Sequence, residues 1–366
     1  MRVVAVAVLL LLAAAPAAAE QPEAPKSWWR GDDATGTWGG GRTWLGRHGV
    51  LIDLDYTAET FARVAGPGTG RRAHYRGTID LYTTIDSGKL GAWKGGTLFV
   101  YGQSGHGGGV SPGIAADMPL SNLEAPDFIE LAEAWYEQYL GDERITLRLG
   151  KQDSNRDFAA PRFPGNFLHS SYGALPTIPM PTFPAAGVGA AVLVDPTSWF
   201  GVRAAVYEGA PEIERLDTAF ADGSFAIGQV MARHHLGCAR PDAIEYTAGG
   251  WYHSTGDAYG LFAVVDALVP LTPGGKRAVG TSVRGAWAHG GDAFVGGALT
   301  FHPVRGNDTV GLGAGHLRGS ETFVEAFYKA RINKWWNVQP DVQIVFQPGG
   351  QDATALVLGL RVKLKL

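Results

Sequence analysis

Residues 355–366 alternate without interruption between two kinds of side chain, and this pattern constrains the fold more than any other feature. Successive side chains of a β-strand point to opposite faces, so one face of this segment is apolar and the other carries three cations. In a soluble sandwich the apolar face would pack on a second sheet, whereas in an outer-membrane barrel it faces lipid and the charged face lines a wet lumen. The apolar set is Leu356, Leu358, Leu360, Val362, Leu364 and Leu366, and the opposite set is Ala355, Val357, Gly359, Arg361, Lys363 and Lys365.

The N-terminus favours the membrane alternative. Residues 1–19 have the parts of a secretory signal peptide, with Arg2 at the start, an apolar run over 3–12 and alanines up to a cleavage site after Ala19. That run is too short for a retained membrane helix, and no later stretch has the roughly 18 consecutive apolar residues that a spanning helix needs. We therefore predict an exported chain that crosses the membrane with strands.

The composition suits a barrel and argues against other classes. The formal net charge of -4 leaves no basic footprint for nucleic acid. The 52 glycines are about twice the ordinary share, and with 11 Trp, 12 Tyr and 16 Phe they suit the turns, bulges and aromatic girdles of a barrel. Cys238 is the only cysteine, so no internal disulfide stabilises the chain, and closure of a barrel in lipid would supply stability instead.

Sixteen segments have the composition and length of strands that cross a bilayer at a tilt. An even number is what single-chain bacterial barrels have, so we predict an all-β fold, a transmembrane antiparallel β-barrel of sixteen strands. The segments are 50–62, 76–86, 96–104, 128–140, 143–152, 187–195, 199–208, 224–235, 243–255, 259–269, 277–287, 291–301, 307–316, 321–332, 337–347 and 354–366.

The connections between these segments alternate in length. Tight ones at 141–142, 195–198 and 333–337 fall on the side that holds both chain ends, and long ones include 105–127, 153–186 and 209–223. Short periplasmic turns opposite long external loops are typical of outer-membrane barrels. The 153–186 loop is rich in proline and aromatic residues, and two interpretations stay open: an external cap, or a fold into the lumen that narrows it.

Strand parity selects the side chains that line the lumen. A charged side chain on the lipid face costs on the order of 2–4 kcal/mol for Arg or Lys at mid-depth, so charges must face water. A two-residue turn at 141–142 would place Glu137 opposite Thr146 and Trp135 opposite Arg148. Any lumen needs polar residues, so none of them is a site by itself. The candidates for lining the pore and contacting solute are Asp53, Asp55, Glu59, Asp80, Tyr82, Glu133, Trp135, Glu137, Arg148, Arg203, Glu325 and Arg331.

This candidate set carries both signs of charge with aromatic residues among them. A lumen ringed by one sign would screen ions by charge. A mixed lumen instead favours neutral, hydroxylated solutes, since sugar hydroxyls can bond to carboxylates and guanidinium groups. The C–H faces of a sugar can lie on Trp135, Tyr82 or Tyr139. The pattern thus favours the passage of sugars.

Catalytic and metal-binding signals are weak. Residues 102–106 read Gly-Gln-Ser-Gly-His, which lacks the glycine two residues after the serine and the strand–turn–helix setting of a serine hydrolase. His234, His235 and Cys238 lack a fourth ligand at a zinc spacing. Asp32 and Asp33 lack the spaced oxygen ligands of a calcium loop. We predict no catalytic residues, no metal and no cofactor.

Several motifs are similar to those of one family. Residues 38–45 read Trp-Gly-Gly-Gly-Arg-Thr-Trp-Leu, 249–253 read Gly-Gly-Trp-Tyr-His, and 335–343 read Trp-Trp-Asn-Val-Gln-Pro-Asp-Val-Gln. Further matches are Ser-Asn-Leu-Glu-Ala-Pro at 121–126, Leu-Ala-Glu-Ala-Trp-Tyr-Glu-Gln at 131–138, Glu-Ala-Phe-Tyr at 325–328, Pro-Gly-Gly at 348–350 and Leu-Gly-Leu-Arg at 358–361. Over most of 36–366 the chain resembles the carbohydrate-selective porins of the outer-membrane porin B type.

The resemblance implies a sixteen-stranded barrel that passes glucose and other sugars by diffusion, with a short periplasmic helix before the first strand. The chain departs from the family at His169, where the family has Asn before Ser, and at Ala267, where it has Gln. Its final Leu366 replaces the usual terminal aromatic residue that the assembly machinery reads. The implied organisation is a signal peptide (1–19), a periplasmic segment (20–49) and the barrel (50–366).

We therefore expect a passive channel for carbohydrates, without enzymatic activity, in the outer membrane of a Gram-negative bacterium. Its expected partners are outer-membrane lipid, neutral sugars as solutes and the barrel-assembly machinery, with a homotrimer as an open alternative to a single barrel and no nucleic acid. The alternative function is a general porin for ions and small polar solutes. An outer-membrane lipase and an adhesin are two further hypotheses. The sequence offers no serine and histidine pair on the lipid face for a lipase, and no repeats in the loops for an adhesin.

Overall fold

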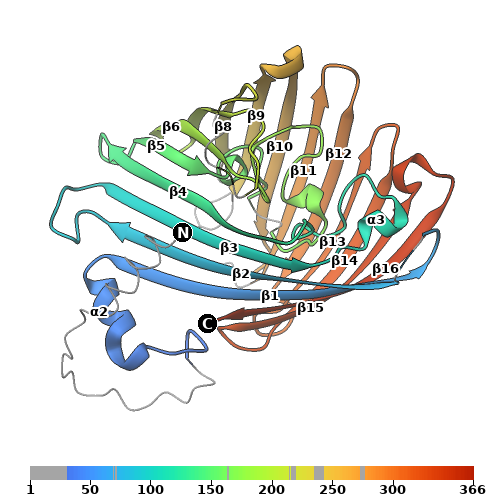
Figure 1. Cartoon of the computed structure of the whole chain (residues 1–366), viewed down its shortest axis with the longest axis horizontal. Helices are drawn as coiled ribbons and strands as arrows, with labels where there is room; N and C mark the ends of the chain where they lie inside the picture. The colour runs from blue at the N-terminus through green and yellow to red at the C-terminus, as the bar shows by residue number, and fades with distance from the viewer. Residues whose placement is uncertain are drawn as a thin grey trace.

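The chain forms a closed barrel of sixteen antiparallel strands, which confirms the predicted fold (Figure 1). The structure is a computed structural model that describes residues 31–68, 70, 72–162, 165–213, 215, 220–234, 243–272 and 277–366. The predicted signal peptide lies outside the described residues, as do His235 and Cys238. Each strand pairs with its neighbours in sequence, and the first strand closes the barrel on the last.

All sixteen predicted segments are strands, and no strand end differs from its prediction by more than three residues. The strands are β1 (Val50–Ala65), β2 (Ala73–Asp86), β3 (Gly96–Gly107), β4 (Phe128–Leu140), β5 (Ile145–Gln152), β6 (Gly187–Thr197), β7 (Phe200–Glu208), β8 (Ser224–His234), β9 (Ala243–His253), β10 (Ala258–Pro270), β11 (Ala278–Ala288), β12 (Ala293–His302), β13 (Thr309–Leu317), β14 (Thr322–Arg331), β15 (Trp336–Phe346) and β16 (Thr354–Lys365). Short helices are η2 (Trp38–Gly40), α2 (Gly41–Arg47) and α3 (Ser111–Ile114), with η3, η4, η5 and η7 at Ser154–Arg156, Ser170–Tyr172, Thr255–Asp257 and Pro348–Gly350.

The seam between β1 and β16 shows why the C-terminal alternation exists. Glu59 lies opposite Arg361 in the register, and their side chains form an ion pair at 2.6 Å. Lys363 and Lys365 form ion pairs with the β1 acids two residues off the direct register, at 2.8 Å to Asp55 and 3.0 Å to Asp53. The inward cations of the last strand therefore neutralise the inward acids of the first strand. The leucines of the other parity face outward, where lipid would cover them.

The hairpin between β4 and β5 corrects one prediction. The strands are joined by residues 141–144, and Glu137 lies opposite Arg148 instead of Thr146. The predicted two-residue turn was wrong because Asp142 and Glu143 both adopt left-handed backbone conformations, with φ of 54° and 67°, and extend the loop. The register moves by two residues, an even step that leaves every side chain on its predicted face. It also brings Arg148 beside Glu137.

The longest connections lie at one end of the barrel. Residues 108–127, 153–186 and 209–223 all follow odd-numbered strands, so they leave the end opposite to the one that holds α2 and the C-terminus. The shorter loops at the other end, together with α2 just before β1 (Figure 1), give the predicted asymmetry. Among the described residues, no helix has the length and apolar character required to span a membrane.

The 153–186 loop enters the lumen, which decides between the two interpretations of its sequence. It runs inside the ring of strands (Figure 1), and Phe158, Leu168 and Tyr172 are buried there in one cluster with inward-facing wall residues such as Phe323 and Phe327. The main apolar core of the molecule is therefore packed between this loop and the inner wall.

Inward glycines on β13 make room for the loop. A Cβ atom placed on Gly313 would lie 2.1 Å from the hydroxyl of Tyr172, and one on Gly311 would lie 3.0 Å from the ring of Phe167. The rings of Phe167 and Tyr172 stack on each other at 4.2 Å. Bare backbone on β13 therefore lets two loop aromatics lie directly against the wall.

Candidate functional site

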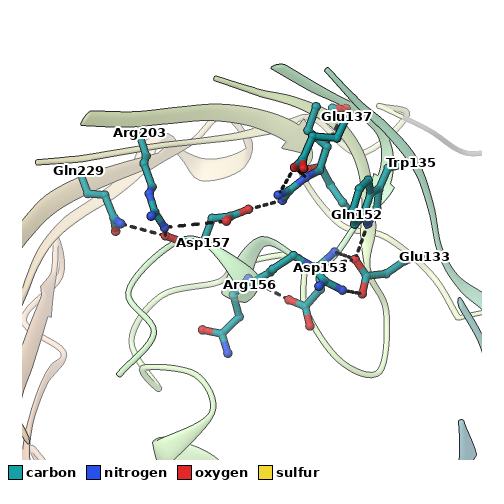
Figure 2. A network of polar contacts seen from close by, with 12 residues as sticks. Glu133, Trp135, Glu137, Gln152, Asp153, Arg156, Asp157, Arg203 and Gln229 are labelled. Carbon is teal, nitrogen blue, oxygen red and sulfur yellow. Dashed lines mark hydrogen bonds and ion pairs between the residues drawn. The ribbon is translucent and has the colours of Figure 1, made fainter. Parts of the chain in front are cut away.

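The first half of the inward loop is held by ion pairs to β4, β5 and β7 (Figure 2). Arg148 forms ion pairs with Glu137 of β4 and with Asp157 of the loop. Arg203 of β7 donates a hydrogen bond to the backbone oxygen of Asp157 at 3.0 Å, and Gln229 of β8 donates another at 2.8 Å. Buried charge-assisted hydrogen bonds of this kind fix geometry strongly. The loop is therefore attached at Asp157 to three strands, β5, β7 and β8.

Glu133 makes a second attachment beside the first (Figure 2). Its carboxylate forms an ion pair with Arg156 and accepts hydrogen bonds from the indole of Trp135 at 3.0 Å and the backbone of Asp153 at 3.2 Å. Burial, together with the charge of Glu133, raises the pKa of Asp153 to about 6. Docking of this part of the loop thus places one carboxyl in a setting that disfavours its charge.

The second half of the loop is held by the opposite wall. Glu325 of β14 accepts hydrogen bonds from the backbone N–H groups of Leu168 at 2.6 Å and His169 at 3.1 Å. The hydroxyl of Tyr172 donates to the backbone oxygen of Gly297 at 2.9 Å. Burial and the nearby Arg284 lower the pKa of His169 to about 3, so its ring is neutral and stacks on Phe323. The loop therefore bridges the lumen from wall to wall.

A second loop, 108–127, lies against β1, β2, β15 and β16. Ser121 donates a hydrogen bond to Glu59, and Arg361 donates one to the side-chain oxygen of Asn122 at 2.8 Å. Gln343 of β15 donates to the backbone oxygen of Leu120 at 2.8 Å. The ion pair that closes the barrel thus also anchors this loop.

A cavity of about 320 Å³ lies between the two loops and the walls of β1–β3 and β14–β16. This volume is at the lower end of the range, about 300–1,000 Å³, that holds small molecules in proteins. The lining residues are Thr57, Asp80, Tyr82, Tyr101, Gln103, Asn122, Leu123, Asn166, Phe167, Lys329, Asn337, Gln339, Arg361 and Lys363.

Asp80 and an aromatic row form one wall of the cavity. Oδ1 of Asp80 accepts hydrogen bonds from the hydroxyl of Tyr101 and from Gln103, both at 2.7 Å. The rings of Tyr82 and Tyr101 stack at 4.5 Å. The row continues along the inner wall to Phe99 and Trp135, which stack at 4.8 Å. A carboxylate beside flat apolar rings can accept hydrogen bonds from the hydroxyls of a solute while the C–H groups of that solute lie on the rings.

Eleven of the twelve candidates from the sequence divide into three groups, and Arg331 belongs to none of them. Asp80 and Tyr82 line the cavity. Six candidates either bond to the inward loop or bond to a side chain that does so: Glu133, Trp135, Glu137, Arg148, Arg203 and Glu325. Asp53, Asp55 and Glu59 pair with the cations of β16, and Arg331 ends β14 with its guanidinium bonded to the backbone oxygen of Asn333.

The candidate set missed several residues that line the cavity. Tyr101, Gln103 and Gln339 have the inward parity of their strands, and that signal could have identified them. Asn122 and Asn166 lie in loops without any period, and nothing local in the sequence predicts that they meet in the lumen.

The structure gives no support to a metal site or a hydrolase in the part of the chain that it describes. No group of three or more His, Cys, Asp or Glu residues there is arranged to hold a metal ion. Ser104 and His106 both lie within β3, so they have no strand–turn–helix setting.

A closed sixteen-stranded barrel with an apolar exterior, a polar lumen and an inward loop that narrows it defines a porin of the outer-membrane type. The chain belongs to the carbohydrate-selective porin, OprB family, whose model matches residues 70–257 and 245–366. It is therefore a sugar-selective channel and not an enzyme.

Solved structures share the fold. The high pH structure of Pseudomonas putida OprB is 17% identical with a TM-score of 0.84, and the alignment covers 93% of this chain and 100% of that one. The low pH structure of the same protein is 18% identical with a TM-score of 0.66, covering 92% and 99%. A triple mutant of the Rhodopseudomonas blastica porin is 12% identical with a TM-score of 0.50, covering 87% and 100%. A search of curated proteins found no match.

Proposed function

We propose that neutral sugars cross the barrel through the cavity between the two inward loops. The observation that carries this proposal is the pairing of Asp80 with the stacked Tyr82 and Tyr101 in that cavity. Hydroxyls of the sugar donate to the carboxylate, and its C–H face lies on the rings. Side-chain amides of Asn122 and Asn166 stand on the loop side of the same space.

Transport is passive in this proposal. Each contact is weak enough to release, so the solute moves along successive polar and aromatic groups down its gradient. The loop attachments at Arg148 and Glu325 keep the width of the path constant, because both ends of the loop are bonded to the wall. No energy source and no covalent step is needed.

Liposome swelling with a series of sugars and with amino acids of matched size tests the proposal. We expect faster entry of sugars in the wild type. Asp80→Asn and Tyr82→Ala should each lower the sugar preference by about threefold to tenfold, the range that one lost hydrogen bond or ring contact represents. Tyr259→Ala, which removes an outward-facing tyrosine of β10 outside the cavity lining, is the matched control. Equal entry of sugars and amino acids in the wild type would contradict the proposal.

We also propose that residues 1–19 are removed on export, that residues 20–49 lie in the periplasm, and that 50–366 form the barrel in the outer membrane of a Gram-negative bacterium. The apolar exterior and the position of α2 beside the C-terminus support this arrangement. Cell fractionation followed by N-terminal sequencing of the mature protein is the test. A mature chain that still begins at Met1, or that fractionates with the cytoplasm, would overturn it.

For assembly, we propose that the barrel-assembly machinery inserts the chain and that barrels associate as homotrimers. Small outward residues on β11–β13, such as Gly285, Gly297 and Ala314, support close approach between barrels because small side chains let backbones meet in lipid. Mass spectrometry of the protein in mild detergent should give the mass of three chains. The mass of a single chain would contradict the trimer.

A further inference from the structure

The cations around the cavity are not equally neutralised. Arg361 is held by Glu59, with hydrogen bonds of 2.8 and 2.6 Å. Lys363 forms an ion pair with Asp55 at 2.8 Å. Lys329 of β14 lines the same cavity, and in the described part of the chain no carboxylate comes within ion-pair distance of it. Among the described residues, the Lys329 ammonium donates one hydrogen bond, to the side-chain oxygen of Asn166 at 2.6 Å.

Three cations, Lys363, Arg361 and Arg331, act on Lys329 with charge of its own sign. The cavity therefore has an electropositive corner where β14 and β16 face the loop. Of the cations that line the cavity, Lys329 is the one without a carboxylate partner in the part of the chain that the structure describes. An ammonium group has three donors, of which Asn166 takes one. Within the part of the chain that the structure describes, the other two donors have no protein acceptor.

The opposite wall cannot neutralise this corner. Asp80 is the one carboxylate among the lining residues, and its strand β2 is separated from β14 by β1, β16 and β15. Four steps of about 4.8 Å between neighbouring strands place the two backbones far apart along the wall. Asp80 is also engaged by Tyr101 and Gln103. The cavity thus has a hydroxyl-accepting side and a carboxylate-accepting side.

We propose that the channel takes sugar acids, such as aldonates and uronates, as well as neutral sugars. Lys329 binds the solute carboxylate, and Asp80 with Tyr82 receives the hydroxylated part. A carboxylate in this corner forms a charge-assisted hydrogen bond, which is about twice as strong as a neutral one, and it relieves repulsion among the four cations. This proposal rests on the path proposed above.

A purely structural role for Lys329 makes a different prediction. If its only task is to hold Asn166 in place, its loss changes the width of the path and affects neutral and acidic sugars alike. If it binds the solute, its loss affects the acid selectively. The ratio of gluconate entry to glucose entry therefore separates the two roles, and charge-preserving substitution separates charge from shape.

The experiment measures uptake of labelled gluconate and labelled glucose into proteoliposomes that contain the full-length mature protein. Lys329→Met should lower the gluconate-to-glucose ratio by about tenfold, the factor that a lost hydrogen bond to a charged group represents. Lys329→Arg should keep the ratio within about threefold of the wild type. Asp80→Asn should raise the ratio, because it removes the negative charge that repels the acid.

Lys89→Met is the matched control, since Lys89 lies in the 87–95 connection outside the cavity and its loss removes the same charge. The inference is overturned if Lys329→Met leaves the ratio unchanged or lowers both uptakes equally, or if Lys89→Met lowers the ratio as much. Failure of the proposed sugar path would be seen separately. Glucose would then enter through the wild-type channel no faster than an amino acid of equal size.

Discussion

At the scale of single residues, Gly313 shows how a missing side chain shapes the channel. We predict that Gly313→Ala moves the inward loop, because its new Cβ atom would lie 2.1 Å from the hydroxyl of Tyr172 and 2.9 Å from the ring of Phe167. Overpacking of this kind costs about 1–3 kcal/mol, and release of the two rings relieves it. Single-channel conductance in a planar bilayer should rise.

The matched control for this substitution is Gly102→Ala on β3. A Cβ atom there would meet no atom closer than 4.0 Å, so the conductance should stay at the wild-type value. A Gly313→Ala channel with unchanged conductance and unchanged open-channel noise would mean that the wall adjusts and the loop stays in place.

At the scale of elements, the 153–186 loop carries two buried titratable groups that respond to acid in opposite directions. The pKa of His169 is lowered to about 3, so between pH 6.5 and 3 the released loop binds a proton that the docked loop does not, and docking weakens as the pH falls. The pKa of Asp153 is raised to about 6, so docking gains stability as the pH falls from about 6 towards 4. Each proton contributes at most about 1.4 kcal/mol per pH unit.

Two variants separate these effects. Asp153→Asn leaves the histidine, so its loop should become more accessible to protease between pH 6 and 4. His169→Gln leaves the carboxyl, so its loop should become less accessible over the same range. Hydrogen exchange of the backbone N–H groups of 165–172 reports the same trend. Parallel pH responses of the two variants would contradict the assigned directions.

The sequence predicted the strands well because a period of two is a local property that each segment carries by itself. The loops are different. Glu325 on β14 could be placed on the inner face from parity, but its partners Leu168 and His169 are distant in the chain, and no pattern in the loop specifies them. The β4–β5 register failed for a related reason, since the left-handed conformations of Asp142 and Glu143 are set by the whole hairpin.

At the scale of the whole molecule, the barrel has exchanged the usual places of its polar and apolar residues. The exterior is rich in exposed aliphatic side chains such as Val283, Leu299 and Leu312, while the interior buries charges such as Glu325 and Arg76. This inversion is stable only if lipid covers the outside, because water would leave a large apolar surface unburied. Inside, the apolar side chains of the inward loop pack against the wall, and the charged attachments hold the loop there.

The inversion can be tested with two arginines placed at equally exposed positions. Val283, 58% exposed, lies at the middle of β11, and Leu271, 53% exposed, lies in the connection after β10. In lipid, Val283→Arg should lower the free energy of unfolding by about 2–4 kcal/mol and Leu271→Arg by about 0–1 kcal/mol. In water both would stay within about 0.5 kcal/mol of the wild type. Urea unfolding of the protein in lipid vesicles measures the difference, and equal effects of the two substitutions would mean that lipid does not cover β11.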